Sequence, residues 1–294
     1  MSEAPACAAP DRAPRRPVVA VPPLACDSHL HVFGPAARYP YQPTRGYTPP
    51  DSPVPEMQAL HKALGIGRAV LVQASVHGTD NRAILDAVAT DPTRYRAVAA
   101  VTEDVTDAEL ARLHAGGVRG FRVNLVDKGG MPFRSLASLE QVAARVRDFG
   151  WHAELLVHVE ESPEFVEIAR RLPIPVSVGH IGYTKAAVAL AHPGYQEFLA
   201  LLRDGLVWVK LTGPNRLSAS DRAPYADVAP LARAVMEAAP DRIVWGTDWP
   251  HVMLKGVMPN DADLIDLLAE WVPDAALRHR ILVDNPATLY GFGP

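Results

Sequence analysis

Residues 24–31 read Leu24-Ala-Cys-Asp-Ser-His-Leu-His31, a short apolar run that ends in two histidines one residue apart. Seven further runs follow it along the chain, rich in Val, Leu, Ile and Ala with little polar alternation. Such runs are typical of parallel strands buried on both faces. The predicted strands are Leu24–His31, Arg68–Ser75, Tyr95–Thr102, Val118–Leu125, His152–Val157, Pro175–Ile181, Leu206–Gly213 and Arg242–Asp248.

Longer amphipathic segments separate these strands and have the periodicity of helices. They are Pro55–Leu64, Asn81–Ala89, Asp107–Ala115, Leu139–Phe149, Pro163–Arg171, Tyr195–Leu202 and Tyr225–Ala238, with one or two closing helices over Asp261–Val272 and Asp274–Val283. Strands that alternate with helices favour an α/β fold with a parallel sheet, and eight of them favour a closed (β/α)8 TIM barrel. A doubly wound dinucleotide-binding fold is disfavoured, because Gly-x-Gly-x-x-Gly does not follow the first strand.

Proline marks two segments outside this pattern. Residues 1–23 contain six prolines and three arginines, which predicts a flexible arm before a single barrel domain over residues 24–294. Residues 33–55 form a Pro-rich connection that is too long for an ordinary βα loop. Because it follows the first strand, we expect this connection to be a lid over the site.

The composition excludes several classes of function. The net charge is −4 and there is no basic stripe, which argues against a nucleic-acid partner. No apolar run approaches the roughly 20 residues that span a bilayer. Cys7 and Cys26 have neither metal-binding nor disulfide spacing. We expect a cytoplasmic protein that acts on a small molecule; a homo-oligomer is compatible with the sequence.

Polar side chains gather where three predicted strands end. His29 and His31 end the first strand and share one side of it. The sixth strand ends in Val178-Gly-His180-Ile-Gly182, and the eighth in Trp245-Gly-Thr-Asp248-Trp-Pro-His251. Singly, such a histidine can cap a loop and such an aspartate can cap a helix. Because the carboxyl ends of barrel strands meet at one face, three such clusters predict a common active site.

Cationic side chains follow two other strands. Arg122 ends the fourth strand and Lys128 lies in the loop after it, while Arg216 follows the seventh strand. Arginines at the mouth of a site suit planar anions, so we expect these groups to bind substrate; a loop cap or a surface ion pair is the alternative. Further candidates for substrate binding, with loop packing as the alternative, are Tyr47, Ser75 and His251.

Taken together, Asp27-x-His-x-His31, Gly179-His-Ile-Gly182 and the segment Trp245–His251 resemble the motifs of the amidohydrolase superfamily. Within it, the chain resembles the branch of 2-pyrone-4,6-dicarboxylate and sugar-acid lactonases, from Leu24 to Phe292. The resemblance implies catalytic roles for His29, His31, His180 and Asp248, and it implies that Arg216 binds a carboxylate. Some members of the superfamily bind one or two divalent ions with such groups, whereas the pyrone lactonase works without a metal.

Metal dependence turns on two strands. Arg122 occupies the end of the fourth strand, where no bridging lysine is recognisable, and this argues against a binuclear centre. On the fifth strand Glu154, Leu156 and His158 compete for the inward position, and an inward Glu154 or His158 would favour one zinc ion. We expect that no cofactor is required. The alternative is one Zn²⁺ or other divalent ion on His29, His31, His180 and Asp248.

The predicted activity is hydrolysis of a small anionic lactone, resembling 2-pyrone-4,6-dicarboxylate, a muconolactone or a sugar-acid lactone. Asp248 would take a proton from the attacking water and later return one to the leaving oxygen. The three histidines would polarise the carbonyl and stabilise the oxyanion. The alternatives are a galactarolactone-type isomerase, a zinc-dependent amidohydrolase or decarboxylase, and a non-catalytic barrel that binds an acidic metabolite.

Overall fold

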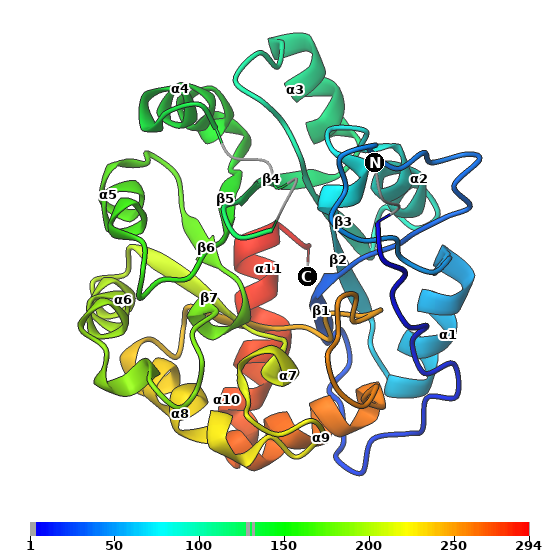
Figure 1. Ribbon diagram of the computed structural model, residues 1–294, viewed down its shortest axis with the longest axis vertical. Helices are drawn as coiled ribbons and strands as arrows, with labels where there is room; N and C mark the ends of the chain where they lie inside the picture. Colours follow the sequence, from blue (N-terminus) through cyan, green and yellow to red (C-terminus); the bar gives the residue numbers. More distant parts are fainter. Residues whose placement is uncertain (1–3, 128–129, 131–132, 294) are drawn as a thin grey trace.

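Eight parallel strands form one ring in chain order (Figure 1). The computed structural model describes residues 4–127, 130 and 133–293. The predicted single (β/α)8 barrel is confirmed, and each observed strand lies inside its predicted run. The strands are β1 Cys26–Leu30, β2 Arg68–Val72, β3 Tyr95–Ala99, β4 Val118–Asn124, β5 His152–Leu156, β6 Val176–Val178, β7 Val207–Leu211 and β8 Ile243–Trp245.

Most helices surround the ring of strands, while the last helix, α11, lies in the centre of the view, across one end of the ring (Figure 1). They are α1 Val54–Leu64, α2 Arg82–Ala89, α3 Asp107–Ala115, α4 Leu136–Val146, α5 Pro163–Arg171, α6 Pro193–Arg203, α7 Pro214–Leu217, α8 Ala229–Ala238, α9 Asp261–Trp271, α10 Ala275–His279 and α11 Asn285–Tyr290. Helix α4 begins three residues before its predicted start, because Ser135 and Ser138 form a capping box there. None of the helices in the described part of the chain is long and apolar enough to cross a membrane.

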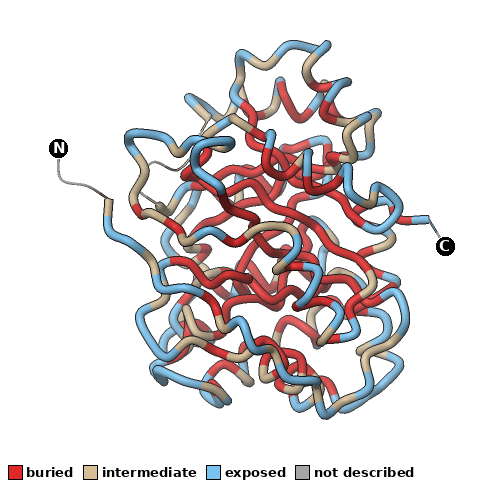
Figure 2. The backbone as a smooth tube through the Cα atoms, turned by 90° about the vertical axis from the view of Figure 1, so that its right-hand side faces the viewer, coloured by how far each residue is buried: buried red, intermediate tan, exposed pale blue. Residues whose placement is uncertain are grey.

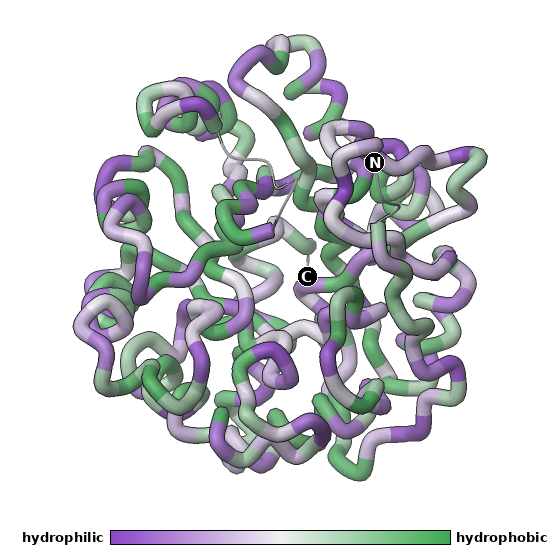
Figure 3. The backbone as a smooth tube through the Cα atoms, viewed as in Figure 1, coloured by the Kyte–Doolittle hydropathy of each residue, from purple (hydrophilic) through white to green (hydrophobic). Residues whose placement is uncertain are grey.

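Two apolar layers hold the barrel together. Between strands and helices lies the main core, which contains large buried side chains such as Trp151 and Phe198. Inside the ring, Tyr290 and Phe292 from the C-terminal segment pack against inward residues of several strands and fill that end of the barrel. Buried backbone runs through the centre of the molecule (Figure 2), and the strands are largely hydrophobic (Figure 3).

The seam between β1 and β8 closes the ring. Asp248 N donates to His29 O at 2.8 Å, and His31 N donates to Trp249 O at 2.8 Å. The strands approach so closely that a Cβ on Gly246 would lie 2.5 Å from His29 N, so only glycine fits.

Asp27 ties this seam together and is fully buried. Its Oδ1 accepts from the backbone N–H groups of Thr247 at 3.0 Å and His29 at 3.2 Å. Its Oδ2 accepts from Thr247 Oγ1 at 2.6 Å and lies 3.3 Å from His61 Nε2 of α1. One carboxylate therefore joins β1, β8 and α1.

The N-terminal segment differs from the free arm that its composition predicts. Cys7 N donates to Thr48 O at 2.9 Å, which binds the segment to the connection after β1. Arg12 Nε lies 3.0 Å from Glu56, and Arg15 Nη2 lies 2.8 Å from Asp266 of α9. Residues 4–23 thus lie against the barrel through backbone hydrogen bonds and ion pairs, which do not require the apolar content that the segment lacks.

Replacing Asp27 tests the seam. We expect Asp27→Ala to lower the free energy of unfolding by about 3–5 kcal/mol, because it leaves several buried donors without an acceptor. Thr247→Val removes the hydroxyl that donates to Asp27 and accepts from Trp249 N. It leaves the other donors to Asp27 in place, should cost about 1–2 kcal/mol and serves as the control. Urea unfolding at pH 7 measures both. An unchanged midpoint for Asp27→Ala would show that the seam does not depend on this carboxylate.

Candidate active site

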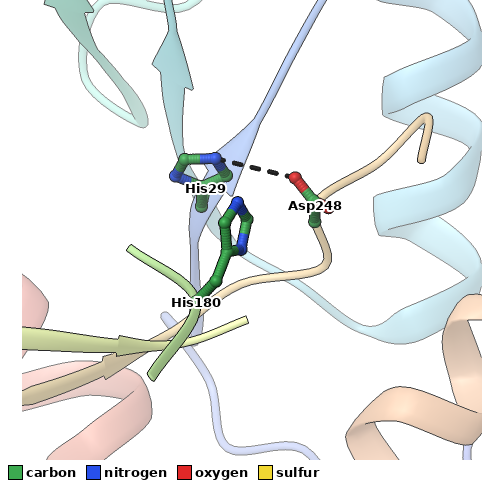
Figure 4. Close-up of side chains that lie close together, drawn as sticks. All are labelled: His29, His180 and Asp248. Atoms are coloured by element: carbon green, nitrogen blue, oxygen red, sulfur yellow. Dashed lines mark ion pairs between the residues drawn. The ribbon is translucent and has the colours of Figure 1, made fainter. Parts of the chain in front are cut away.

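Four of the predicted site residues meet at the carboxyl end of the barrel. His29 Nε2 lies 3.6 Å from Asp248 Oδ1, and His31 Nε2 lies 4.0 Å from the same oxygen. The His180 ring centroid is 5.2 Å from that of His29. Figure 4 shows His29, His180 and Asp248 pointing toward one another from three separate elements. All four side chains are buried.

A bulge in β1 aims the histidine pair. The pairing of β1 with β2 shifts register between Asp27 and Leu30. Cys26 packs among the residues inside the barrel, while Leu30 belongs to the outer core. Strict alternation from Cys26 would have turned His29 and His31 outward. The extra residue of the bulge turns both rings into the barrel.

Backbone strain marks the other two positions. His180 and Asp248 have φ angles of 50° and 66°, in the left-handed region that non-glycine residues rarely adopt. The hydrogen bond from Asp248 N to His29 O and the one from His180 N to Thr212 Oγ1 (3.2 Å) hold these conformations. Beside them a Cβ on Gly213 would lie 2.7 Å from His180 Nδ1, so glycine makes room for the imidazole.

Arg216 is the ion-pair partner of Asp248. Its Nε donates to Asp248 Oδ2 at 2.7 Å, and its Nη2 donates to Val252 O at 3.0 Å. Burial alone would raise the pKa of Asp248, but the charge of the Arg216 guanidinium beside it lowers the pKa well below its usual range. Asp248 is therefore an ion at neutral pH. Arg216, which was predicted to bind substrate, therefore donates two of its hydrogen bonds to groups of the protein itself.

The three imidazoles are neutral, because burial lowers the pKa of each. His31 Nδ1 lies 2.8 Å from Val72 O, and a carbonyl only accepts, so the proton is on Nδ1 and Nε2 presents a lone pair toward Asp248. His180 Nδ1 lies 2.9 Å from Thr212 Oγ1, which can donate or accept. His31 therefore accepts hydrogen bonds, which differs from the prediction that all three rings donate.

Of the three candidates for the inward position of the fifth strand, Glu154 is the residue that contacts the site. Its Oε1 lies 3.2 Å from His29 Nδ1, on the side of the ring away from Asp248. Leu156 is buried, and His158 lies after the strand, where its Nδ1 is 2.8 Å from Tyr183 O and its ring stacks on Tyr183. An inward Glu154 is one of the two arrangements that would favour a zinc ion. Its carboxylate, however, contacts His29 Nδ1, the ring nitrogen that faces away from Asp248.

Lys210 of β7 is a site residue that the sequence analysis missed. Its Nζ forms an ion pair with Glu154 Oε2, donates to Ser28 O at 2.8 Å and lies 3.2 Å from His29 Nδ1. The side chain is wholly buried. The only signal in the sequence was a lysine within the apolar run Val-Trp-Val-Lys-Leu, where a charge requires a partner.

Arg122 lies at the end of β4 and is 5% exposed. Its Nη1 donates to Gln73 O at 2.8 Å. Among the described residues no carboxylate lies within ion-pair distance of this guanidinium. Arg122 thus combines a buried positive charge with unused hydrogen-bond donors.

The remaining predicted substrate-binding residues are placed differently. Tyr47 and Ser75 are buried, and Tyr47, which lies in the connection after β1, packs in an apolar cluster with Phe33 and Val76. His251 Nε2 lies 2.9 Å from Asp261 at the start of α9, a buried pair that anchors the loop after β8. Lys128 lies outside the described residues.

A cavity of about 370 Å³ opens at the mouth of the site, between the loops that follow β5 to β8. Arg216 links the cavity to the buried centre, because it lines the cavity and also bonds Asp248. Its lining is largely polar: His158, Glu160, Glu161, Tyr183, Lys185, Asn215, Arg216, Met253, Leu254 and Lys255. Its size suits a small polar molecule.

The family pattern described as amidohydrolase matches residues 26–292. The chain belongs to the amidohydrolase family. It is 40% identical over 285 residues to a 2-pyrone-4,6-dicarboxylate hydrolase from Comamonas testosteroni, which covers 94% of this chain and 93% of the relative. It is 39% identical over 273 residues to a 4-sulfomuconolactone hydrolase from Hydrogenophaga intermedia, covering 92% and 90%.

A solved structure shares the fold of this amidohydrolase. It is that of a probable 2-pyrone-4,6-dicarboxylic acid hydrolase from Acinetobacter baumannii with citric acid bound. Its TM-score is 0.81 at 27% identity, and the match covers 92% of this chain and 100% of the other.

The side chains of this amidohydrolase suit one divalent ion by type and spacing. His29, His180 and Asp248 each offer a ligand atom, and these atoms lie within 4.8 Å of one another. Two imidazoles and a carboxylate are a donor set that zinc accepts. A metal requires an unprotonated nitrogen from each ring, so the tautomer of each histidine decides whether the set is complete.

The Arg216–Asp248 pair can be measured by a double-mutant cycle. We expect Arg216→Met to cost about 3–5 kcal/mol of stability at pH 7, because it leaves a buried carboxylate unpaired. Adding Asp248→Asn should restore part of that loss. Urea unfolding of the wild type, the two single variants and the double variant gives the coupling energy. If Arg216→Met lowered the free energy of unfolding equally in the wild-type background and in the Asp248→Asn background, the pairing would be contradicted.

The same cycle has a pH dependence. In the wild type the lowered pKa of Asp248 adds stability that is present above the unfolded pKa of about 3.9 and is lost below it. Without Arg216 the pKa of Asp248 rises, and protonation then relieves the unpaired charge. The difference in the free energy of unfolding between the wild type and Arg216→Met should therefore become smaller as the pH falls from 7 toward 4.

Proposed function

We propose that this amidohydrolase hydrolyses a lactone that carries a carboxylate or sulfonate. The observation that carries the proposal is Arg122, a buried guanidinium with no carboxylate within ion-pair distance in the described part of the chain. A buried cation without a counter-ion costs several kcal/mol. An anionic substrate arm would supply that counter-ion through two parallel hydrogen bonds.

The relatives support the same substrate class. The two curated relatives are hydrolases of a dicarboxylate lactone and a sulfonated lactone, and the solved relative holds citric acid, a tricarboxylic acid. All three molecules carry carboxylate or sulfonate groups. We infer that this chain takes a small polyanionic lactone into the cavity at the barrel mouth.

Two acceptors in the site suit the attacking water. His31 Nε2 and Asp248 Oδ1 both accept hydrogen bonds and lie 4.0 Å apart. A water that donates one proton to each, with hydrogen bonds of about 2.8 Å, requires acceptors about 4–4.5 Å apart. Such a water keeps its lone pairs for the lactone carbonyl. Asp248 then takes its proton and returns one to the leaving oxygen.

The carbonyl oxygen becomes negative in the transition state and requires N–H donors. Among the histidines this role falls to His29 and His180, because His31 presents a lone pair. One such donor is worth about 2.7–4 kcal/mol of transition-state stabilisation. A divalent ion, when bound by His29, His180 and Asp248, supplies Lewis-acid polarisation of the same oxygen.

Hydrolysis can be separated from isomerisation and from metal dependence in one set of assays. Wild type and Asp248→Asn are incubated with 2-pyrone-4,6-dicarboxylate, 4-sulfomuconolactone and galactarolactone in H₂¹⁸O. We expect one ¹⁸O in the product and a loss of at least about 100-fold in Asp248→Asn, since an amide cannot accept the proton.

An isomerised lactone without ¹⁸O would instead show a galactarolactone-type isomerase. Metal analysis before and after chelation, with activity measured each time, tests the expectation that no metal is required. Loss of activity on chelation and its return with zinc would favour the zinc-dependent alternative. Tight binding of every lactone without turnover would favour the non-catalytic barrel.

Arg122→Met tests the anion contact. Removing a charge-assisted bidentate contact costs about 1.5–3 kcal/mol, so kcat/KM for the anionic lactone should fall about 10- to 150-fold. A lactone that lacks the anionic arm should be a poor substrate for the wild type and lose little further in the variant. Equal losses on charged and neutral lactones would show that Arg122 is structural.

A further inference from the structure

A buried ion pair lies directly beneath His29. Lys210 has a wholly buried side chain, and the side chain of Glu154 is 2% exposed. The Lys210 ammonium lies within reach of three acceptors: Glu154 Oε2, Ser28 O at 2.8 Å and His29 Nδ1 at 3.2 Å. A protonated lysine has three N–H groups and no lone pair, so toward each of these partners it can only donate.

This contact constrains the position of a proton on His29. An imidazole nitrogen that accepts from an ammonium carries no proton of its own. A neutral His29 therefore has its proton on Nε2, the nitrogen that faces Asp248 Oδ1 at 3.6 Å. An N–H in that position is attracted by the carboxylate, whereas a lone pair would be repelled.

Glu154 is the competing partner, since its Oε1 also lies 3.2 Å from His29 Nδ1 and would accept a proton placed there. Yet the contact between His29 Nδ1 and Glu154 Oε1 lacks the geometry of a hydrogen bond from a ring N–H group, while the Lys210–His29 contact has hydrogen-bond geometry. By this geometry the ring nitrogen accepts from Lys210 and does not donate to Glu154. Val72 O imposes the opposite tautomer on His31, two residues away.

We propose that Lys210 is a positioning residue that holds His29 in the Nε2–H tautomer. The two histidines of the motif then have different tasks: His29 donates to the reacting carbonyl oxygen, and His31 accepts from the attacking water. These tasks rest on the proposed function, whereas the tautomer does not. The same proton occupies the nitrogen that would bind a divalent ion, so Lys210 makes His29 a donor at the expense of a ligand.

The test is nitrogen NMR of protein labelled with ¹⁵N-histidine, in which two-bond couplings distinguish the two tautomers of each ring. The His29 signals are assigned by their loss in His29→Asn. In the wild type we expect Nε2–H for His29 and Nδ1–H for His31. An Nδ1–H signal for His29 would overturn the proposal, and this measurement needs no variant of Lys210.

Variants of the ion pair test the cause. In Lys210→Met we expect His29 to switch to Nδ1–H and donate to Glu154, while Glu154→Gln, the matched control, should keep Nε2–H. If Lys210→Met does not fold, Lys210→Met/Glu154→Gln removes both charges together, and His29 should no longer hold the Nε2–H form alone. A pure Nε2–H signal in whichever of the two variants without Lys210 folds would show that Lys210 does not set the tautomer.

Kinetics adds a separate readout on the lactone that the wild type hydrolyses. Lys210→Met should lower kcat about 100-fold with little change in KM, because an oxyanion donor acts in the transition state. A loss confined to KM would contradict the assigned task of His29. If the wild type opens no lactone, the proposed function fails while the NMR result still decides the tautomer.

Discussion

The carboxylate of Asp27, buried between the first and last strands, is the contact on which the site depends. It binds backbone and side-chain donors of Thr247 and the backbone of His29, so it joins the two ends of a chain that folds into a ring. His29 and Asp248 stand on opposite sides of that seam and share a backbone hydrogen bond. Closure of the barrel therefore also brings His29 and Asp248 together.

Buried charges lie in layers above this seam. The Glu154–Lys210 pair lies on one side of the neutral imidazoles, and the Asp248–Arg216 pair lies on the other side, at the mouth of the site. In each pair the positive and the negative charge neutralise each other, because an unpaired charge is costly in the low dielectric of the interior. Arg122 stands apart, because no carboxylate of the described residues pairs with it. In the proposed function, an anionic substrate supplies the counter-ion that Arg122 lacks.

Much of this was readable in advance. A strand buried on both faces must be apolar along its whole length, so eight apolar runs marked the eight strands. The carboxyl ends of barrel strands meet at one face, so His29, His31, His180 and Asp248 were candidates for a single site before any coordinates. Composition reports apolar content and not hydrogen bonds such as the one between Cys7 and Thr48, so the sequence did not indicate these contacts of the N-terminal segment.

Periodicity and chain order, which are local properties, were enough to determine the barrel and the face on which its chemistry lies. The partners of the charged groups were decided only by the tertiary structure. Arg216 bonds Asp248, 32 residues away, and Lys210 contacts His29, 181 residues away. Nothing near a lysine or an arginine in the chain says which group lies across the barrel from it. The bulge in β1 and the shared interior bring these groups together, and distance in space, not in sequence, sets their charges and protons.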